Sequence, residues 1–434
     1  MPFRVRLGRA SWYPRSGLRS PGSSPAHVTS RLDHDKRPGG TSMSSTATIL
    51  AGVGPGGLAT EERTGLRIAI SGGGTGGHIV PGLHLLEHLR ESGGGLGDLV
   101  WFGSGRGVEE RVLKHLDGRT GPAPVEVLSL ALEPRSGGAP SWMGLAVRTA
   151  PSVQRVRQAL REHRTQVVLG LGGYVTAPVA LAAKSLGIPM ALLEINSVVG
   201  KANQWLSPLC QRVYHAWEET LPAGGGQRHL HMGPPVSPRL EPTDGEPSRS
   251  AAKRRLGFDV GRPLLVVLGG SQGAQAINLA LAAGSGTLVE KGISILHQVG
   301  PGKMDQAAGL KSKSYRAVEY VDKMHRALRA ADLVLCRGGA STMAEVAAVQ
   351  TPAWVVPYTH HRDNHQMHNA QQLGDGVRVV PESTLADVLP ELPGFMGERG
   401  AAERERMRRA LRRCVPRNAA RLILDDLERL ANGL

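Results

Sequence analysis

Short apolar runs, each followed by apolar residues at helical spacing, recur along the chain from Leu66 onward. A run of four to six apolar residues that ends at glycine or proline predicts a buried strand, and spacing of three to four residues predicts an amphipathic helix. The strands we expect cover residues 66–71, 99–103, 125–129, 167–170, 189–194, 264–268 and 333–336. Strands that alternate with helices indicate parallel sheets covered on both faces, so the fold class is doubly wound α/β.

The same pattern divides the chain into segments. In order they are a disordered basic extension (1–64), a first α/β domain (65–235), a linker (236–262), a second α/β domain (263–396) and C-terminal helices (397–434). The extension is rich in Ser, Gly, Pro and Arg without periodicity, and Met43 within it offers an alternative start. We expect a short helix at 249–256 in the linker, and two C-terminal helices separated by Pro416.

Two glycine turns stand at equivalent places in the two domains. Strand 66–71 leads through the glycine-rich residues 72–77 and His78 into a helix, and strand 264–268 leads through 269–274 into another. Glycine lets the backbone approach a ligand, and the N-terminus of a helix favours anions, so either turn could hold phosphate or bind nothing. The repetition predicts two similar domains that face each other across a cleft, with ligand loops at the carboxyl ends of the strands.

Charge and cysteine content narrow the possible partners. The formal net charge is +15, and residues 1–42 carry eight Lys or Arg against two Asp. Basic residues are not interleaved with aromatic ones and no nucleic-acid-binding motif is visible, so an anionic membrane surface or an acidic substrate fits better than nucleic acid. The three cysteines have neither disulfide nor metal-ligand spacing, which indicates a reducing cytoplasm. No run of eighteen apolar residues predicts a membrane span.

Six stretches, taken in order, resemble the motifs of the MurG glycosyltransferase family, which adds N-acetylglucosamine to undecaprenyl-diphosphoryl-N-acetylmuramyl-pentapeptide (lipid I) to make lipid II. They are residues 73–78, 172–174, Glu194 with Asn196, 269–274, Arg337 with 340–345, and 363–366 with 369–370. The resemblance covers about residues 66–430. It implies a GT-B fold of two Rossmann-like domains facing across a cleft, with the lipid acceptor on the first domain and UDP-N-acetylglucosamine mostly on the second.

The activity implied by the resemblance is inverting, metal-independent transfer without a cofactor. It would serve peptidoglycan synthesis, and with it cell shape and division, from the cytoplasmic face of the bacterial inner membrane as a peripheral protein. Two rival functions stay open: a GT-B transferase acting on another acceptor, such as a diacylglycerol or a small molecule, and a non-catalytic protein that binds a nucleotide sugar.

The resemblance also assigns roles to residues of the second domain. Ser271 would contact the donor diphosphate, the backbone of Val321 would recognise uracil, and Gln366 would contact the sugar hydroxyls. The helix start from Ala340 to Glu345 would bind phosphate with its first residues and the ribose with Glu345. The members of this helix start are Ala340, Ser341, Thr342, Met343, Ala344 and Glu345.

In the first domain, Thr75, Gly76, Gly77 and Asn196 match positions that reach the donor sugar. His78 matches the histidine near the acceptor diphosphate, and a neutral imidazole could also take the proton of the acceptor hydroxyl. We therefore expect His78 to act as general base or as acceptor-diphosphate ligand. The alternative is a histidine that only caps the turn.

Two positions depart from the family pattern. Leu193 stands where the family often has a histidine, so the identity of the base is open. Ser237 stands where an arginine is common, which leaves one donor-phosphate contact in question, although Arg239 lies two residues further on.

Two other features have competing interpretations. The histidines 360, 361, 365 and 368 could suggest a metal, but the family uses none there. Residues 139–164 have the spacing of an amphipathic helix, which suits either a packed core helix or a segment on anionic lipid. Because the implied acceptor is a lipid, we expect Trp142, Met143 and Leu145 to contact the membrane surface.

Overall fold

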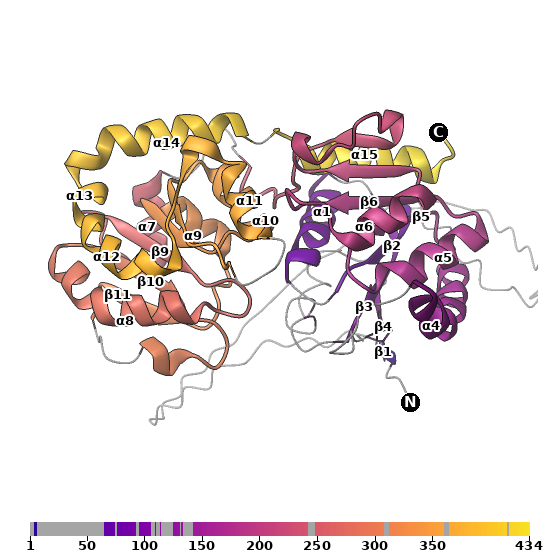
Figure 1. The fold of residues 1–434 in the computed structure, drawn as a ribbon, viewed down its shortest axis with the longest axis horizontal. Helices are drawn as coiled ribbons and strands as arrows, with labels where there is room; N and C mark the ends of the chain where they lie inside the picture. Colours follow the sequence, from indigo (N-terminus) through magenta and orange to yellow (C-terminus); the bar gives the residue numbers. More distant parts are fainter. Residues whose placement is uncertain are drawn as a thin grey trace, which may run out of the picture. The chain divides into compact units, whose positions relative to one another are not determined.

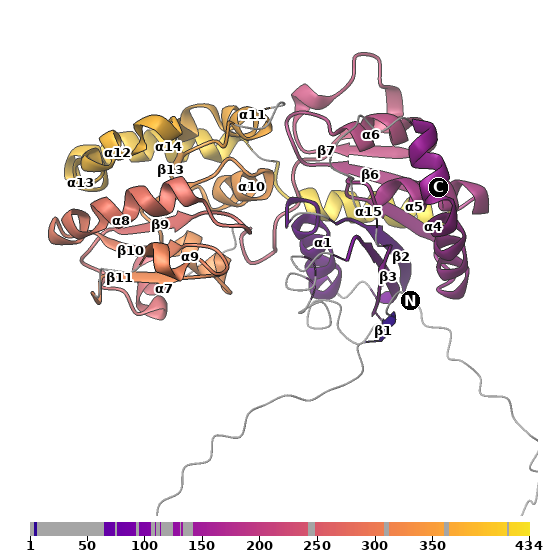
Figure 2. The ribbon, with the colours of Figure 1, turned by 60° about the horizontal axis from the view of Figure 1, so that its bottom comes forward.

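In the computed structural model, most of the chain forms two β-sheets of mainly parallel strands, and helices cover both faces of each sheet (Figures 1 and 2). The described residues are 4–6, 65–73, 76–92, 95–105, 109, 113, 125–130, 132, 142–241, 248–307, 312–359, 364–414 and 416–434, without the side chains of 4–6, 76 and 142–150. The following description concerns these residues.

The first sheet has the strand order β1-β4-β3-β2-β5-β6-β7-β8. Its strands are β1 (Arg4–Arg6), β2 (Leu66–Ser71), β3 (Leu96–Gly103), β4 (Val125–Ser129), β5 (Val167–Gly170), β6 (Met190–Glu194), β7 (Arg212–His215) and β8 (His229–His231). All neighbours are parallel except β1, which pairs antiparallel with β4. Residues 4–6 thus depart from the expectation of an irregular extension, because the edge of β4 offers unpaired backbone groups to them.

The second sheet has the order β11-β10-β9-β12-β13-β14, and every neighbouring pair is parallel. Its strands are β9 (Leu264–Leu268), β10 (Ser294–Gln298), β11 (Tyr315–Val318), β12 (Leu333–Cys336), β13 (Ala353–Val355) and β14 (Val377–Val379). Strands β9, β10 and β12 are buried along their whole length, as strands covered on both faces must be. The expected repetition of one architecture is confirmed.

The strand orders place a topological switch point in each sheet. The chain starts at β2, moves to one edge through β3 and β4, and returns to lie beside β2 as β5; the second sheet does the same with β9 and β12. Loops that leave two such adjacent strands run to opposite sides, which opens a crevice at their carboxyl ends. The loops after β2, β5, β9 and β12 therefore lie where ligands bind in this class of fold.

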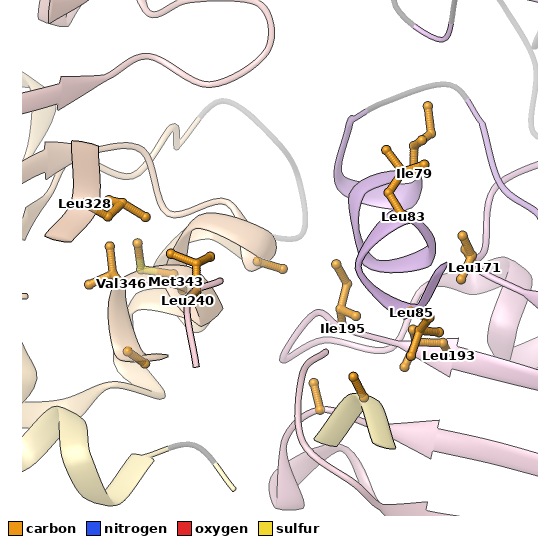
Figure 3. Packing of buried hydrophobic residues seen from close by; sticks show 14 of the residues in the cluster. Ile79, Leu83, Leu85, Leu171, Leu193, Ile195, Leu240, Leu328, Met343 and Val346 are labelled. Atoms are coloured by element: carbon orange, nitrogen blue, oxygen red, sulfur yellow. The ribbon is translucent and has the colours of Figure 1, made fainter. Parts of the chain in front are cut away.

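Buried residues fix the first glycine turn against the sheet. The helices of this sheet are α1 (Val80–Glu91), α4 (Trp142–Glu162), α5 (Thr176–Leu186) and α6 (Lys201–Leu206). Ile79, Leu83 and Leu171 belong to the cluster of buried side chains around α1 (Figure 3). The indole Nε1 of buried Trp101 donates to the carbonyl of Gly72 at 3.0 Å. Each of these contacts holds the start of α1 against the end of β2.

The second sheet is covered by α7 (Arg249–Leu256), α8 (Gln275–Glu290), α9 (Met324–Ala330), α10 (Ala340–Val349), α11 (His365–Gln371), α12 (Leu385–Val388), α13 (Leu392–Met396) and α14 (Ala401–Cys414). Helix α7 confirms the helix expected in the linker. It begins at Ser248, whose hydroxyl accepts from the amide of Ala251, and it ends at Gly257, whose φ is +74°.

The helices on either side of Pro416 pack on different sheets. In α14, Leu411 lies so close to Gly376 that a Cβ on this glycine would be 2.5 Å from it. In α15 (Ala419–Ala431), Asp426 accepts a hydrogen bond from the hydroxyl of Tyr214 at 2.8 Å and pairs with Arg212 at 3.2 Å. Burial, together with Asp426, raises the pKa of Tyr214, so its hydroxyl stays a donor. The first sheet is therefore completed by residues from the far end of the sequence.

Candidate functional site

The turn after β2 places His78 against the turn after β5. His78 ends a short 3-10 helix (Gly76–His78), and its Nδ1 lies 3.2 Å from the carbonyl oxygen of Gly73. Gly172 and Gly173 have φ of +94° and +80°, and a Cβ on Gly172 would lie 3.6 Å from the imidazole of His78. Glycine is needed there for the backbone conformation, and it leaves the imidazole packed against bare backbone.

The surroundings of His78 favour the neutral imidazole. A carbonyl oxygen can only accept, so Nδ1 carries the proton and Nε2 holds the lone pair in the neutral form. Burial lowers the pKa of His78 and His365 lowers it further, while the hydrogen bond with Gly73 and the charge of Glu194 act in the opposite direction. The arrangement supplies a neutral, oriented imidazole at the carboxyl end of a strand, which is what a general base requires.

Glu194, the last residue of β6, organises the next loop at this edge of the sheet. Its carboxylate is 2% exposed and accepts four hydrogen bonds. Oε1 accepts from the amide and the side chain of Asn196, and Oε2 accepts from the amide of Gly200 and from Asn203, both at 2.8 Å. Four donors compensate the burial of the charge, so Glu194 fixes the loop that presents Asn196.

Asn369 on α11 joins this loop to the loop after β12. Its side chain is fully buried, and its Oδ1 accepts from the amide of Ser197 at 2.8 Å and from the Ser197 hydroxyl at 3.0 Å. Its Nδ2 donates to the carbonyl of Gly338 at 3.1 Å and to Oδ1 of Asn196 at 3.4 Å. The resemblance includes Asn369 in a motif but assigns it no role. In the structure its side chain connects Gly338, 31 positions away in the sequence, with Asn196, 173 positions away.

The turn after β9 is built for close approach of backbone to backbone. Gly273 has φ of +71°, and a Cβ there would lie 2.1 Å from the carbonyl oxygen of Val299. The side chain of Gln298 donates to the carbonyl of Gly270 at 3.2 Å, and Lys303 donates to that of Gln272 at 2.8 Å. Half-buried Ser271 lies within this supported loop, directly before α8. The loop combines backbone amides, a hydroxyl and a helix start, as a diphosphate site requires.

The start of α10 has a second feature of an anion site. Gly339 precedes the helix and offers no side-chain cap, so the first amides of α10 are not capped by a side chain. The hydroxyl of Ser341 is buried, and no hydrogen-bond partner for it occurs in the described part of the chain. A buried hydroxyl without a partner is unfavourable unless a ligand supplies one, so this helix start can accept an oxyanion.

Gln366 and Glu345 lie close to this helix start. A Cβ on Gly338 would lie 2.1 Å from the carbonyl oxygen of Gln366, and the side-chain oxygen of Gln366 accepts from the amide of Tyr358 at 3.0 Å. Glu345 in α10 is 8% exposed, and its Oε1 lies 3.7 Å from Nε2 of His84 in α1. Val321 is also buried, just after β11.

Most predicted site residues thus lie in loops or helix starts that follow the strands at the two switch points. In the first domain these are Gly76, Gly77 and His78, and in the second they are Ser271 and the start of α10. Asn196 follows β6, the strand next to β5. Thr75 lies outside the described residues. The roles assigned to these residues stay predictions.

The two departures from the family pattern are both buried. Leu193 is 1% exposed and packs in the core beneath α1 (Figure 3), so this position serves packing in this chain. Ser237 is 8% exposed, and its hydroxyl accepts from the amide of Arg239 at 3.4 Å. The side chain of Arg239 is exposed. Burial lowers the pKa of His325 in α9 and the charge of Arg239 lowers it further, so Arg239 lies beside this helix.

The structure describes only part of the histidine-rich loop and of the segment 139–164. His360 and His361 lie outside the described residues, and across the described ranges no three His, Cys, Asp or Glu could hold one metal ion. Trp142, Met143 and Leu145 lie in α4 but their side chains are not described, whereas Val156 and Leu160 further along the helix are buried in the core. The described helices contain none that is long and apolar enough to cross a membrane.

Two family models match the chain, one over each domain. Residues 68–215 match the glycosyltransferase family 28 N-terminal domain, and residues 264–386 match the glycosyltransferase family 28 C-terminal domain. These ranges contain the end of β2, β3 to β7 and β9 to β14, and so the loops at both switch points.

Two relatives that match this chain over most of its length carry the same name. The UDP-N-acetylglucosamine–N-acetylmuramyl-(pentapeptide) pyrophosphoryl-undecaprenol N-acetylglucosamine transferase of Thermus thermophilus is 35% identical over 367 residues, which cover 83% of this chain and 99% of that protein. The protein of the same name from Mannheimia succiniciproducens is 32% identical over 336 residues, covering 75% and 88%. The crystal structure of Acinetobacter baumannii MurG matches with a TM-score of 0.57 at 25% identity, covering 83% of this chain and 99% of that one. The chain therefore belongs to the MurG family of N-acetylglucosamine transferases and has the GT-B fold that its sequence predicted.

Proposed function

We propose that this chain transfers N-acetylglucosamine from UDP-N-acetylglucosamine to lipid I and so makes lipid II for peptidoglycan. The observation that carries this function is the similarity to transferases of that name over both domains, including the loops at both switch points. The enzyme is a UDP-N-acetylglucosamine-dependent hexosyltransferase, and the two loops of the second sheet have the chemistry that its donor requires.

The donor diphosphate would bind between the turn after β9 and the start of α10. Ser271 and the amides of its turn would donate to phosphate oxygens. The buried hydroxyl of Ser341, which has no partner among the residues that the structure describes, would donate to another. Glu345 would accept hydrogen bonds from the ribose, the backbone of Val321 would recognise uracil, and Gln366 would contact the sugar. Thr342, Met343 and Ala344 complete the helix start, in which Met343 and Ala344 are buried and support the backbone that binds.

In the transfer step, the acceptor hydroxyl attacks the anomeric carbon from the face opposite the diphosphate. The new carbon–oxygen bond forms as the bond to the UDP oxygen breaks, so the configuration inverts and UDP leaves with the electron pair. His78 would take the hydroxyl proton on Nε2. The hydrogen bond of Nδ1 with Gly73 and the lowered pKa support this role over that of a cationic ligand for the acceptor diphosphate.

The membrane-bound acceptor implies work at a lipid surface. We place the enzyme as a peripheral protein on the anionic cytoplasmic face of the bacterial inner membrane, with Trp142, Met143 and Leu145 at the start of helix α4 in contact with lipid. The basic excess of the chain, +15, supports attraction to such a surface. Replacing Trp142, Met143 and Leu145 together by Ser should weaken binding to vesicles with anionic lipid, measured by co-sedimentation; unchanged binding would contradict this placement.

A transfer assay tests the function itself. Radiolabelled UDP-N-acetylglucosamine is incubated with lipid I and, separately, with diacylglycerol, and the lipid fraction is counted. We expect label only with lipid I. Label in diacylglycerol would indicate a transferase for another acceptor, and no label with either would indicate a nucleotide-sugar-binding protein.

A further inference from the structure

Two histidines one turn apart on α1 bind the segment that leads out of the first domain. Nδ1 of His84 lies 3.1 Å from the carbonyl oxygen of Pro235, and Nε2 of His88 lies 3.0 Å from that of Val236. Carbonyl oxygens only accept, so each of these nitrogens carries a proton. Helix α1 therefore holds two consecutive carbonyls where the first domain ends and the linker starts.

The same segment is held from the second domain. The guanidinium of Arg329 on α9 donates to the carbonyl of Arg239 at 3.1 and 2.9 Å, and to the carbonyl of Glu241 at 3.0 Å. Residues 235–241 are thus bound through their carbonyls by side chains of both α1 and α9. A segment bound in this way has a defined path.

His84 differs from His88 in what its second nitrogen faces. Because Nδ1 of His84 is used on Pro235, Nε2 is the nitrogen that lies 3.7 Å from Oε1 of Glu345. His84 is 6% exposed and Glu345 is 8% exposed, so the surroundings screen their attraction weakly. His88 contacts a different carboxylate, since its Nε2 lies 3.6 Å from Oε1 of Glu241 in the linker.

The basic side chain that lies against Glu345 is that of His84. Buried Cys336 also lies near Glu345, but burial and the carboxylate raise the pKa of this thiol to about 12, so it stays neutral. In its imidazolium form His84 points an N–H at the Glu345 carboxylate while the other N–H stays on Pro235. This ring can therefore orient the Glu345 carboxylate.

We propose that His84 is a positioning residue of the donor site, which orients the carboxylate of Glu345 and ties this orientation to α1 and the linker. The inference rests on the proposed function, in which Glu345 accepts hydrogen bonds from the ribose of UDP-N-acetylglucosamine. His84 lies on the helix that follows His78, so the same helix serves the acceptor side with its start and the donor side with its middle. His84 itself belongs to no sequence motif of the site.

Two substitutions separate the contacts of His84. The amide nitrogen of Asn can replace Nδ1, so His84→Asn keeps the donor to Pro235 and loses the group that faces Glu345. The amide of Gln reaches the place of Nε2, so His84→Gln keeps a donor for Glu345. His88→Ala is the matched control, because His88 binds the same segment and pairs with Glu241 instead of Glu345.

The measurements are KM and kcat for UDP-N-acetylglucosamine, and Kd for UDP and for 2′-deoxy-UDP by calorimetry. We expect His84→Asn to raise KM about tenfold, equivalent to about 1.4 kcal/mol, with kcat within about twofold. It should also reduce the preference for UDP over 2′-deoxy-UDP, because the misoriented carboxylate distinguishes them less well. His84→Gln should recover most of both losses, and His88→Ala should change neither by more than about twofold.

The possible failures are distinguishable. Wild-type KM and wild-type preference for UDP in His84→Asn would overturn the inference and leave the proposed function intact. Equal effects of His84→Asn and His88→Ala would also overturn it, because the residue would then act only through the linker. If the wild-type protein does not bind UDP-N-acetylglucosamine, the proposed function fails and the inference fails with it. Thermal denaturation of each variant establishes that it is folded, and His84→Gln, which preserves the size of the side chain, tests the inference where His84→Asn does not fold.

Discussion

Gly273 and Gly270 provide a matched pair for testing the turn after β9. Both have positive φ, +71° and +78°, but a Cβ on Gly273 would lie 2.1 Å from the carbonyl oxygen of Val299, whereas one on Gly270 would have nothing within 4 Å. Alanine therefore introduces backbone strain at both positions and a steric overlap at only one. The comparison separates the cost of conformation from the cost of close packing.

The expected magnitudes follow from these two effects. A left-handed conformation costs alanine about 1 kcal/mol relative to glycine, which we expect for Gly270→Ala. Gly273→Ala should cost about 1–3 kcal/mol more, because the overlap is with backbone that must move. Gly300 faces Gly273 so closely that a Cβ on it would lie 2.5 Å from the Cα of Gly273, which leaves the loop no room on that side.

Native-state hydrogen exchange is a suitable assay, because it reports the opening free energy of β9 and β10 separately from the first sheet. The amides of these strands should exchange faster in Gly273→Ala than in Gly270→Ala, by about 5-fold to 150-fold at 25 °C. KM for UDP-N-acetylglucosamine should rise in the same order. Equal exchange rates in the two variants would refute the reasoning, since the clash would then be absorbed without cost.

Three further predictions concern other parts of the molecule. His78→Ala should lower kcat by about 100-fold to 10,000-fold, and His231→Ala, at an exposed position, is the control. Because burial lowers the pKa of His78, the acid limb of the pH profile of kcat/KM should lie below pH 6.5. Full turnover in His78→Ala would exclude the role of base. Burial lowers the pKa of His215 to about 4, against 6.5 in the unfolded chain. The free energy of unfolding should therefore fall by up to about 3 kcal/mol as the pH drops from 6.5 towards 4. Urea titrations of His215→Gln should show a smaller fall. Asn369→Ala should cost about 2–4 kcal/mol because it leaves buried partners without hydrogen bonds, and an unchanged melting temperature would show that water replaces the side chain.

Most strands were predictable because burial on both faces leaves a plain sequence signal. Strands β4, β5, β9 and β12 begin and end where the apolar runs do. The strands that escaped prediction are short or carry polar residues, such as β8, which reads His-Leu-His, and the three-residue β13. In β8 neither alternation nor an apolar run stands out from the surrounding loops. Strand β13 lies in the apolar run 353–356, which ends at Pro357, so it fits the pattern of a buried strand although it was not among the strands that we expected.

The site was predictable only as far as it is local. Glycine turns after strands mark the two switch points in the sequence itself, because a turn that follows a strand lies at a known edge of the sheet. The contacts of His84 with Pro235 and of Asn369 with Asn196 join residues 151 and 173 positions apart, and nothing in the neighbourhood of either residue indicates its partner. Leu193 shows a related limit, because its apolar run predicts a buried strand but does not indicate which side chains it packs against.

The contact of α15 with the first sheet has a consequence for synthesis of the protein. The first sheet ends at β8, but Tyr214 and Arg212 meet Asp426 only after a further stretch of chain has been made. This stretch, from His231 to Ala419, is roughly 190 residues, which a ribosome takes about 10–40 s to add at about 5–20 residues per second. During that interval the second domain can fold while the face of the first sheet that binds α15 is still uncovered. The nascent chain therefore exposes an incomplete first domain to chaperones, although this domain is translated early.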